Sequence, residues 1–376
     1  MVKLTPPMGW NSWNTYGENI NDQLIRETAD AMAAEGLLAK GYEYLVIDDC
    51  WSLRERDAQG RLAADPEKFP YGMKDLADYV HSKGLKFGMY SCGGSLTCAG
   101  YPGSFEHEFV DAETFAEWGV DFLKYDYCYH TPMIAAPYLY RRMGLALENC
   151  GRDILFSACS WGEDQTHEWV KTSSASMWRS TGDIHDAWES VRNLVNQQEV
   201  LHPYNGVGCF NDMDMLVVGI YGKGNVGLQG CNDTQYKTHF SIWALLGSPL
   251  MIGCDVRNMS PAAKAILTNE ELIRINQDPA CRQPVRLHSP WTGLDVVVYF
   301  RQLATGELAI GLFNMGSSAA NACVNLEELG LPFSTGKTLK LRELWTGEES
   351  RAKNSMIMTE LAPYDCAVYR AQVVDA

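Results

Sequence analysis

The chain has 376 residues, of which 46% are hydrophobic and 21% are charged, as in a globular protein large enough for two domains. Its formal net charge of −16 argues against nucleic acid and anionic membrane as partners. No apolar run is long enough to span a bilayer, and the first ten residues lack the apolar segment of a signal peptide. We expect a cytoplasmic protein that binds neither nucleic acid nor membranes. The composition leaves open whether the protein forms a homo-oligomer.

Short apolar segments alternate with segments of helical period over the first three quarters of the chain. The expected strands are 6–13, 42–51, 85–92, 120–128, 152–161, 176–184, 206–215 and 248–255. The expected helices are 21–36, 72–83, 111–119, 135–149, 186–199, 233–246 and 261–276. Eight such units predict a (β/α)8 TIM barrel. A doubly wound open sheet would also alternate, but no Gly-x-Gly-x-x-Gly turn follows the first strand.

The pattern changes after Asp278-Pro279. The segments become short and alternating, and Gly, Ser or Asn separates them, which is typical of antiparallel strands. We therefore predict two domains, a catalytic barrel at 1–282 and a C-terminal antiparallel β-sandwich at 283–376.

Charged residues stand at the ends of several expected barrel strands. They are Asp48 and Asp49 on the second strand, Lys124 and Asp126 on the fourth, Arg179 and Asp183 on the sixth, and Asp212 and Asp214 on the seventh. The first, third and fifth strands add Trp13, Tyr90, Cys159, Ser160 and Trp161. Because the carboxyl ends of barrel strands meet at one mouth, the sequence predicts that these side chains converge there.

Two carboxylates on either side of an anomeric carbon can hydrolyse a glycoside with retention. One attacks as the nucleophile, and the other, kept protonated by its surroundings, donates a proton to the leaving oxygen. The remaining carboxylates would accept sugar hydroxyls, and the Trp13 and Trp161 rings would offer apolar faces. Lys124 would favour the ionised form of Asp126.

Each of these residues also has a structural interpretation. Asp49 could cap a helix, Lys124 and Asp126 could form a structural ion pair, and Trp161 could belong to the core. Clustered carboxylates can also bind a metal, but none of the 8 histidines falls in the proposed strand ends, and the 12 cysteines include no Cys-x-x-Cys pair. We expect no metal and no other cofactor.

Five ordered motifs resemble those of glycoside hydrolase family 27, the family of α-galactosidases and α-N-acetylgalactosaminidases. They are MGWNSW (8–13), IDDCW (47–51), KYDYC (124–128), WRSTGDI (178–184) and NDMDML (211–216), and the resemblance covers essentially the whole chain. It implies a barrel with a C-terminal β domain. It also implies retaining hydrolysis of terminal α-linked galactose from oligosaccharides of the raffinose or galactobiose type.

The resemblance assigns roles by position. Asp126 matches the nucleophile, Asp183 the acid/base, and Asp48 and Asp49 the residues that hold the galactose 4- and 6-hydroxyls. The other implied substrate contacts are Trp13, Tyr90, Lys124, Cys159, Ser160, Trp161, Arg179 and Asp214. The resemblance also implies a disulfide between Cys98 and Cys128. In a reducing cytoplasm these two cysteines would instead remain thiols.

The identity of residue 160 raises the question whether the substrate carries galactose or N-acetylgalactosamine. Many α-galactosidases carry Glu, Gln or Asn at this position, and the N-acetylgalactosaminidases carry Ser, near the substituent on C2. An α-galactosidase is the favoured interpretation and an α-N-acetylgalactosaminidase the alternative. A β-L-arabinopyranosidase is less favoured, because Asp48 suits a sugar with a 6-hydroxyl. A non-catalytic sugar-binding barrel is disfavoured because Asp126 and Asp183 are both present.

Overall fold

Eight short parallel strands form the central sheet of the larger domain in the computed structural model, which describes residues 5–376 apart from the side chain of His202. They are β1 (Met8–Asn11), β2 (Tyr44–Val46), β3 (Lys86–Cys92), β4 (Phe122–Asp126), β5 (Leu155–Cys159), β6 (Met177–Arg179), β7 (Phe210–Asp212) and β8 (Leu250–Ile252). Their order is β7-β6-β5-β4-β3-β2-β1-β8. The segment after β7 closes the ring, because Leu216 N–H donates to Met251 C=O at 2.7 Å. The barrel prediction is confirmed.

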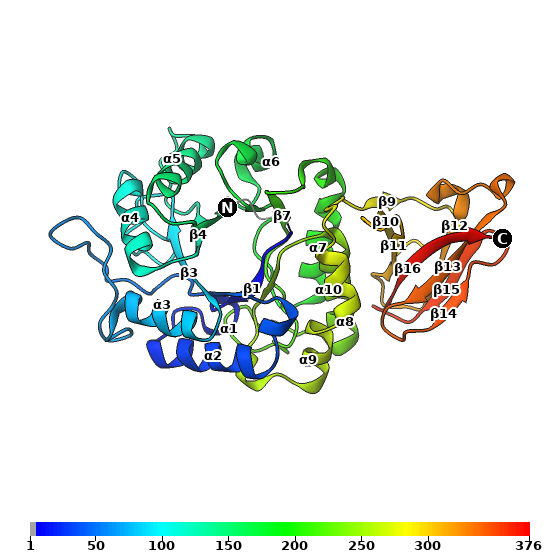
Figure 1. The fold of residues 1–376 in the computed structure, drawn as a ribbon, viewed down its shortest axis with the longest axis horizontal. Helices are drawn as coiled ribbons and strands as arrows, with labels where there is room; N and C mark the ends of the chain where they lie inside the picture. The colour runs from blue at the N-terminus through cyan, green and yellow to red at the C-terminus, as the bar shows by residue number, and fades with distance from the viewer. Residues whose placement is uncertain (1–4) are drawn as a thin grey trace.

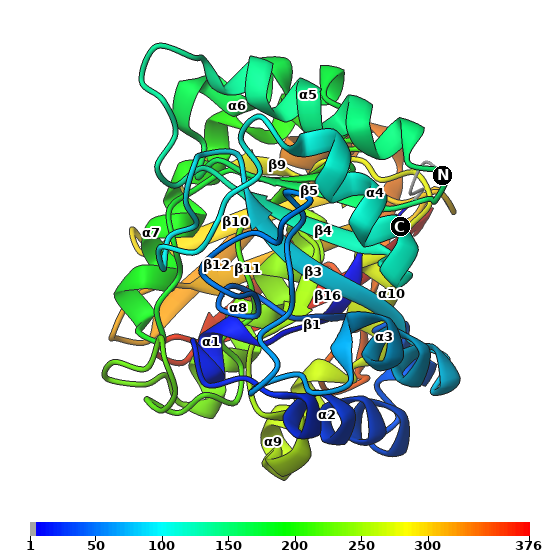
Figure 2. The same cartoon turned by 90° about the vertical axis from the view of Figure 1, so that its left-hand side faces the viewer.

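Helices surround the strands (Figures 1 and 2). They are α1 (Trp13–Tyr16), α2 (Asp22–Ala34), α3 (Gly72–Ser82), α4 (Glu108–Trp118), α5 (Ala136–Asn149), α6 (Thr166–Trp169), α7 (Trp188–Gln197), α8 (Asp233–Leu246), α9 (Pro261–Leu267) and α10 (Glu270–Asn276). No helix within residues 5–376 is both long enough and apolar enough to cross a bilayer.

The expected elements differ from the observed ones mainly at their ends. The first strand ends at Asn11 because the Asn11 side chain accepts the Trp13 N–H at 2.8 Å, where α1 begins. The expected helix 261–276 is two helices, since the Asn269 side chain caps Leu272 N–H and starts α10. Short strands leave the residues that follow them free to form the mouth of the barrel.

The alternation of side chains along β4 explains how charged residues enter a buried strand. Leu123 and Tyr125 point outward into the helix-facing core, whereas Phe122 points into the apolar centre of the barrel. Successive side chains of a strand point to opposite faces, so Lys124 and Asp126 share the inner face with Phe122. The strand therefore places both charges inside the barrel, toward its carboxyl end.

The C-terminal domain contains two antiparallel sheets, ordered β14-β13-β16-β11-β10-β9 and β12-β15. The strands are β9 (Val285–Leu287), β10 (Val296–Gln302), β11 (Leu308–Asn314), β12 (Ala320–Asn325), β13 (Lys337–Glu343), β14 (Glu349–Arg351), β15 (Met356–Leu361) and β16 (Cys366–Asp375). A separate apolar cluster contains residues of both sheets. The predicted β-sandwich is confirmed, while the boundary between 282 and 283 stays a prediction.

The C-terminal sheet packs against the barrel through α8 and its neighbours (Figure 1). Gly311 on β11 lies against Leu245 of α8 and the ring of Phe313, and a Cβ at Gly311 would come within 2.6 and 2.5 Å of them. Trp188 Nε1 donates to Met315 C=O at 3.0 Å. The apolar core is continuous across this contact, so the two domains share one buried interface.

Candidate active site

The carboxyl ends of the barrel strands surround a cavity of about 150 Å³. All the residues predicted to converge at the mouth line it except Cys159, Ser160 and Asp212. This volume is well below the roughly 300–1,000 Å³ of pockets that hold drug-sized ligands. The cavity therefore suits one sugar ring better than a chain of several.

Asp48 follows β2 and lies at the centre of a buried polar network. Lys124 Nζ donates to its Oδ2 at 2.9 Å, and Asn11 Nδ2 donates to the same oxygen at 2.7 Å. The backbone N–H of Asp48 donates to Ser12 Oγ at 3.0 Å. Lys124 therefore forms its ion pair with Asp48, and the alternative of a structural pair between Lys124 and Asp126 is wrong. The strand alternation puts Lys124 and Asp126 on one face, but the carboxylate that pairs with Lys124 comes from the end of β2, which is separated from β4 by β3.

Asp49 joins β2 to the loop after β3. Its Oδ2 accepts the backbone N–H of Ala99 at 3.0 Å, and its Oδ1 accepts the N–H of Cys50 at 2.7 Å. Burial raises the pKa of the Asp49 carboxyl, and the two backbone N–H groups oppose that rise. These bonds fix the orientation of the carboxylate that lines the cavity.

Asp126 is the last residue of β4, and its side chain is almost completely buried. Tyr90 OH donates to Oδ2 at 3.0 Å, and Tyr127 N–H donates to Oδ1 at 3.0 Å. Burial raises the pKa of this carboxyl to about 6, although Lys124 lowers it. The predicted influence of Lys124 thus has the expected direction, but desolvation outweighs it.

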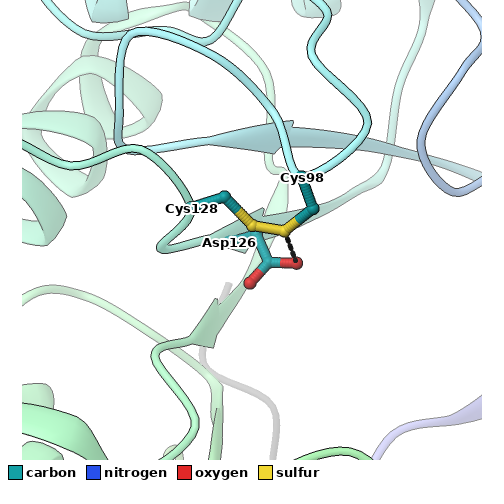
Figure 3. Close-up of side chains that lie close together, drawn as sticks. All are labelled: Cys98, Asp126 and Cys128. Atoms are coloured by element: carbon teal, nitrogen blue, oxygen red, sulfur yellow. Dashed lines mark hydrogen bonds between the residues drawn. A yellow bond between two sulfur atoms is a disulfide. The ribbon is translucent and has the colours of Figure 1, made fainter.

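A disulfide between Cys98 and Cys128 lies directly beside Asp126, with a Cα–Cα distance of 5.1 Å (Figure 3). The Cys98 sulfur is 3.7 Å from Asp126 Oδ2. The bond ties the loop after β3 to the end of β4, as the family resemblance implies.

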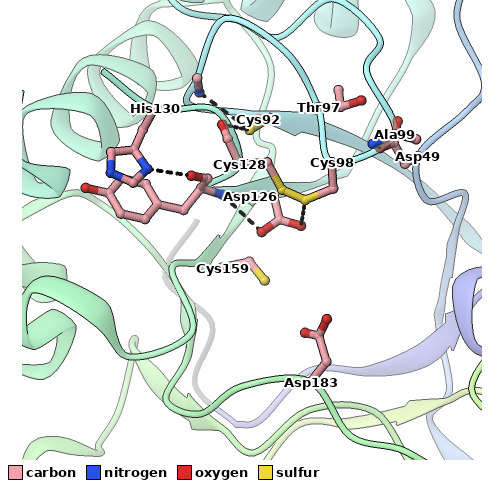
Figure 4. The surroundings of a disulfide bond; sticks show 12 residues. Asp49, Cys92, Thr97, Cys98, Ala99, Asp126, Cys128, His130, Cys159 and Asp183 are labelled. Carbon is pink, nitrogen blue, oxygen red and sulfur yellow. Dashed lines mark hydrogen bonds between the residues drawn. A yellow bond between two sulfur atoms is a disulfide. The ribbon is translucent and has the colours of Figure 1, made fainter. Parts of the chain in front are cut away.

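Asp183 lies in the loop after β6, across the cavity from Asp126 (Figure 4). Arg179 Nη2 binds its Oδ1 at 2.9 Å and also lies 3.0 Å from Oδ2 of Asp214. The Asp183 side chain is 62% exposed, whereas the Arg179 side chain is 4% exposed. Asp183 is therefore the part of this ion-pair network that a ligand entering the cavity would meet first.

The order of the two pKa values differs from the expectation. Burial alone would raise the pKa of Asp183, but the Arg179 guanidinium and the Lys124 ammonium outweigh it and hold that pKa below its usual range. The expectation that the surroundings keep Asp183 protonated is wrong for the free protein. In that state, Asp126 keeps its proton to a higher pH than Asp183 does.

Trp161 and Asp214 have backbone conformations that are unusual for residues with a Cβ, with φ of +56° and +80°. The Asp214 carboxylate joins the loops after β6 and β7 by accepting the N–H groups of Ile184 and Met215, both at 2.7 Å. Trp13 packs on the apolar cluster inside the barrel. The two tryptophans and Asp214 thus line the cavity from fixed backbone positions.

The match to known families agrees with this geometry. A family model described as "Alpha galactosidase A" matches residues 5–278, and one described as "Alpha galactosidase C-terminal beta sandwich domain" matches residues 294–371. The α-galactosidase of Cyamopsis tetragonoloba is 42% identical over 97% of this chain and 85% of its own length. The chain belongs to the α-galactosidase family.

Solved structures of this family superpose closely on the chain. α-Galactosidase I from Mortierella vinacea has a TM-score of 0.91 and 35% identity, covering 98% of this chain and 97% of its own. An α-galactosidase from Saccharomyces cerevisiae with raffinose has a TM-score of 0.87 and 30% identity, covering 99% and 98%. The protein is accordingly a glycosidase of the α-galactosidase family.

Two of the implied substrate contacts do not reach the cavity. Ser160 is completely buried, and its hydroxyl forms a hydrogen bond with Thr166 Oγ1. Cys159 is also completely buried, and its sulfur accepts a hydrogen bond from Arg179 Nη1 at 3.7 Å. Neither side chain lines the cavity in this conformation, and Ser160 could contact a sugar only if the loop after β5 rearranged.

Several cavity residues lay outside the sequence-based prediction. They are Asn14, Cys98, Ile184, His185, Met215, Asn225 and Val226. Ile184, His185 and Met215 are next to predicted residues and could have been found from the same motifs. Asn225 and Val226 belong to the long loop after β7, where no strand end indicates a site.

A larger hollow of about 570 Å³ lies at the opposite end of the strands. Its lining includes Asp153, Ser176 and Cys209, which precede β5, β6 and β7. Active sites of barrels form at the carboxyl ends of the strands, so this hollow is not the catalytic cavity.

Proposed function

We propose that this protein releases terminal α-linked galactose from oligosaccharides by double displacement. Asp126 is the nucleophile and Asp183 the general acid and base. The observation that supports this most directly is that the two carboxyl groups face each other across one small cavity (Figure 4). Retaining glycosidases use two carboxyl groups about 5 Å apart in this way.

In the first step, Asp126 attacks the anomeric carbon and the bond to the leaving oxygen breaks. Asp183 gives its proton to that oxygen, so the aglycone leaves as an alcohol. Tyr90 and the Tyr127 N–H hold the attacking carboxylate in place. The product is a β-linked galactosyl ester of Asp126.

In the second step, water enters the position that the aglycone has left. Asp183, now a carboxylate, removes a proton from this water while the oxygen attacks the anomeric carbon. The ester bond breaks and Asp126 is released. Two inversions restore the α configuration of the sugar.

Substrate binding must reverse the proton distribution of the free protein. Asp183 is mostly exposed before binding, so a sugar that covers it removes water and raises its pKa. The hydroxyl groups of the sugar would also compete for Arg179, which now holds Asp183 ionised. The same ligand thereby moves the proton from Asp126 toward Asp183.

Asp48 and Asp49 would hold the 4- and 6-hydroxyls of galactose. Both carboxylates line the cavity and are fixed by Lys124 and by the Ala99 N–H. A site built to accept the axial 4-hydroxyl disfavours glucose, because the buried carboxylate would lose its hydrogen bond. The cavity size fits removal of one terminal sugar at a time.

The roles of the two acids can be separated with azide. We expect Asp126→Ala and Asp183→Ala each to lose about 10³-fold or more in hydrolysis of an aryl α-galactoside. Azide should attack the galactosyl ester of Asp183→Ala and give the α-galactosyl azide. With Asp126→Ala, azide should take the place of the nucleophile and give the β-galactosyl azide. The opposite pair of products would overturn the assignment.

The sugar itself is tested with three aryl glycosides. We expect the α-galactoside to be cleaved faster than the α-N-acetylgalactosaminide or the β-L-arabinopyranoside. The buried position of Ser160 gives no specific support for an acetamido pocket. Faster cleavage of either alternative substrate would reassign the substrate and leave the two-carboxylate mechanism intact.

We also propose that the protein acts in the cytoplasm and does not bind nucleic acid or membranes. The net charge of −16 supports the absence of anionic partners. Cell fractionation tests the location, and light scattering of the purified protein tests whether it forms a homo-oligomer.

A further inference from the structure

Three potential metal ligands lie together at the nucleophile: Cys98, Cys128 and Asp126 (Figure 3). Their sulfur and oxygen atoms are all within 4.8 Å of one another. Among residues 5–376, these three are the only group of three or more His, Cys, Asp or Glu side chains with that spacing. In the disulfide the two sulfurs are bonded to each other. Reduction would turn them into thiols, whose thiolate forms are strong ligands for soft cations.

The spacing suits a tetrahedral zinc ion. Zinc binds thiolate sulfur at about 2.3 Å and carboxylate oxygen at about 2.0 Å, so neighbouring ligand atoms lie about 3.5–3.8 Å apart. Cys98 Sγ is 3.7 Å from Asp126 Oδ2. Cys98 also lines the sugar cavity, so an ion held here would have its fourth position open to that cavity.

The backbone holds the two cysteines together without the disulfide. Gly93 N–H donates to Asp126 C=O at 2.8 Å, and Ser95 N–H donates to Tyr129 C=O at 3.3 Å. Gly94 packs so closely that a Cβ there would be 2.0 Å from Cys128 C=O. On the other side, Ala99 N–H binds Asp49. Reduction would therefore leave the two cysteine backbones close together, and rotation of the side chains would separate the sulfurs to the spacing that zinc requires.

We propose that reduction of the Cys98–Cys128 disulfide creates a three-ligand site for a thiophilic divalent cation such as Zn²⁺, and that the bound ion blocks Asp126. A phosphine reductant supplies two electrons, water supplies the oxygen of the phosphine oxide, and each sulfur gains one proton. Zinc binding then releases the two thiol protons. The metal site rests on geometry alone, whereas the block of turnover also rests on the proposed role of Asp126.

Exposure of Cys98 distinguishes this pair from the other cysteines. The remaining ten are free thiols, and all of them are buried except Cys150, which is partly exposed. Cys98 is exposed at the cavity, so a hydrated ion can reach it. Cys150 therefore provides a control, because it is the most exposed of these free thiols and does not line the cavity.

The test compares oxidised and phosphine-reduced protein after anaerobic removal of the phosphine. We expect the reduced protein to bind about one more Zn²⁺ per chain than the oxidised protein in equilibrium dialysis. Co²⁺ should give thiolate-to-metal charge-transfer absorption only in the reduced protein. At about 10 μM free Zn²⁺ the reduced protein should lose about tenfold or more in turnover.

Variants identify the ligands. The double variant Cys98→Ser/Cys128→Ser, compared with its own activity without metal, should show neither the cobalt absorption nor zinc inhibition. Cys150→Ser should respond to zinc as the unmodified protein does. Absence of the cobalt absorption in the reduced unmodified protein would overturn the metal site, even if the double variant failed to fold. Zinc binding with unchanged turnover would overturn the block of Asp126, whereas the azide products of Asp126→Ala test its role as nucleophile separately.

Discussion

Asp126 and Asp183 differ in how much water and how much positive charge surround their carboxyl groups. Asp126 is almost completely buried, and burial raises its pKa to about 6. Asp183 is largely exposed and bound by Arg179, which holds its pKa low. The negative charge of Asp183 also contributes, as a smaller effect, to the raised pKa of Asp126.

This pair predicts an acidic optimum for kcat/KM. Above about pH 6 both carboxyls of the free protein are ionised, so no proton donor remains. Below the lowered pKa of Asp183 both are protonated, so no nucleophile remains. Between these limits the two carboxyls hold one proton. Only the protein molecules in which Asp183 carries this proton and Asp126 is ionised can react. We expect kcat/KM for an aryl α-galactoside to fall about tenfold per pH unit well above pH 6. A profile that stays flat to about pH 8 would contradict this order of pKa values.

Ser160 carries a second prediction at the scale of one residue. Its hydroxyl is buried against Thr166 and does not line the cavity. Because the hydroxyl does not reach the sugar, we expect Ser160→Ala to change the ratio of the rates on aryl α-galactoside and aryl α-N-acetylgalactosaminide by less than about twofold. A twofold change in this ratio corresponds to about 0.4 kcal/mol. A shift of tenfold or more would mean that the loop after β5 turns Ser160 toward C2 of the sugar.

At the scale of elements, β4 is joined to β2 through one buried ion pair. The Lys124 and Asp48 side chains are 14% and 2% exposed. Removing one partner leaves the other charge without compensation inside the barrel, which typically costs 3–5 kcal/mol. The pair connects strands that are separated by β3 in the sheet, so it also positions them relative to one another.

We therefore expect Lys124→Met to lower the free energy of unfolding by about 3 kcal/mol or more in urea denaturation. Adding Asp48→Asn should recover part of the loss, because the unpaired charge is then removed as well. Lys74→Met, which breaks the exposed pair with Asp78, should change stability little and serves as the control. Equal effects of the two lysine variants would show that the buried pair does not stabilise the barrel.

At the scale of the whole molecule, the barrel depends on the C-terminal domain for part of its surface. Phe313 and Met315 of the sandwich belong to the same apolar cluster as α7 and α8 of the barrel. Arg301 is buried between the domains, and its Nη1 donates to Arg282 C=O at 3.2 Å. The C-terminal domain thus buries the apolar surface of the barrel around α7 and α8.

Truncation after residue 282 should consequently expose the apolar surface around α8 and lead to aggregation or a lower unfolding temperature. A milder variant, Phe313→Ala, should lower stability by about 3–5 kcal/mol because it opens a cavity at the interface. Thermal unfolding and size-exclusion chromatography measure both effects. A monomeric 1–282 fragment with the unfolding temperature of the full chain would show that the domains are independent.

The sequence by itself determined the barrel, the β-sandwich and most of the cavity. Alternating apolar segments specify parallel strands, and charged residues at their ends converge because every parallel strand points to the same mouth. Tertiary structure decided what depends on neighbours across strands. Lys124 pairs with Asp48 instead of Asp126, Ser160 turns to Thr166, and Arg179 lowers the pKa of Asp183. Strand alternation fixes which face a side chain occupies, but only the closed barrel sets its distance from side chains on other strands.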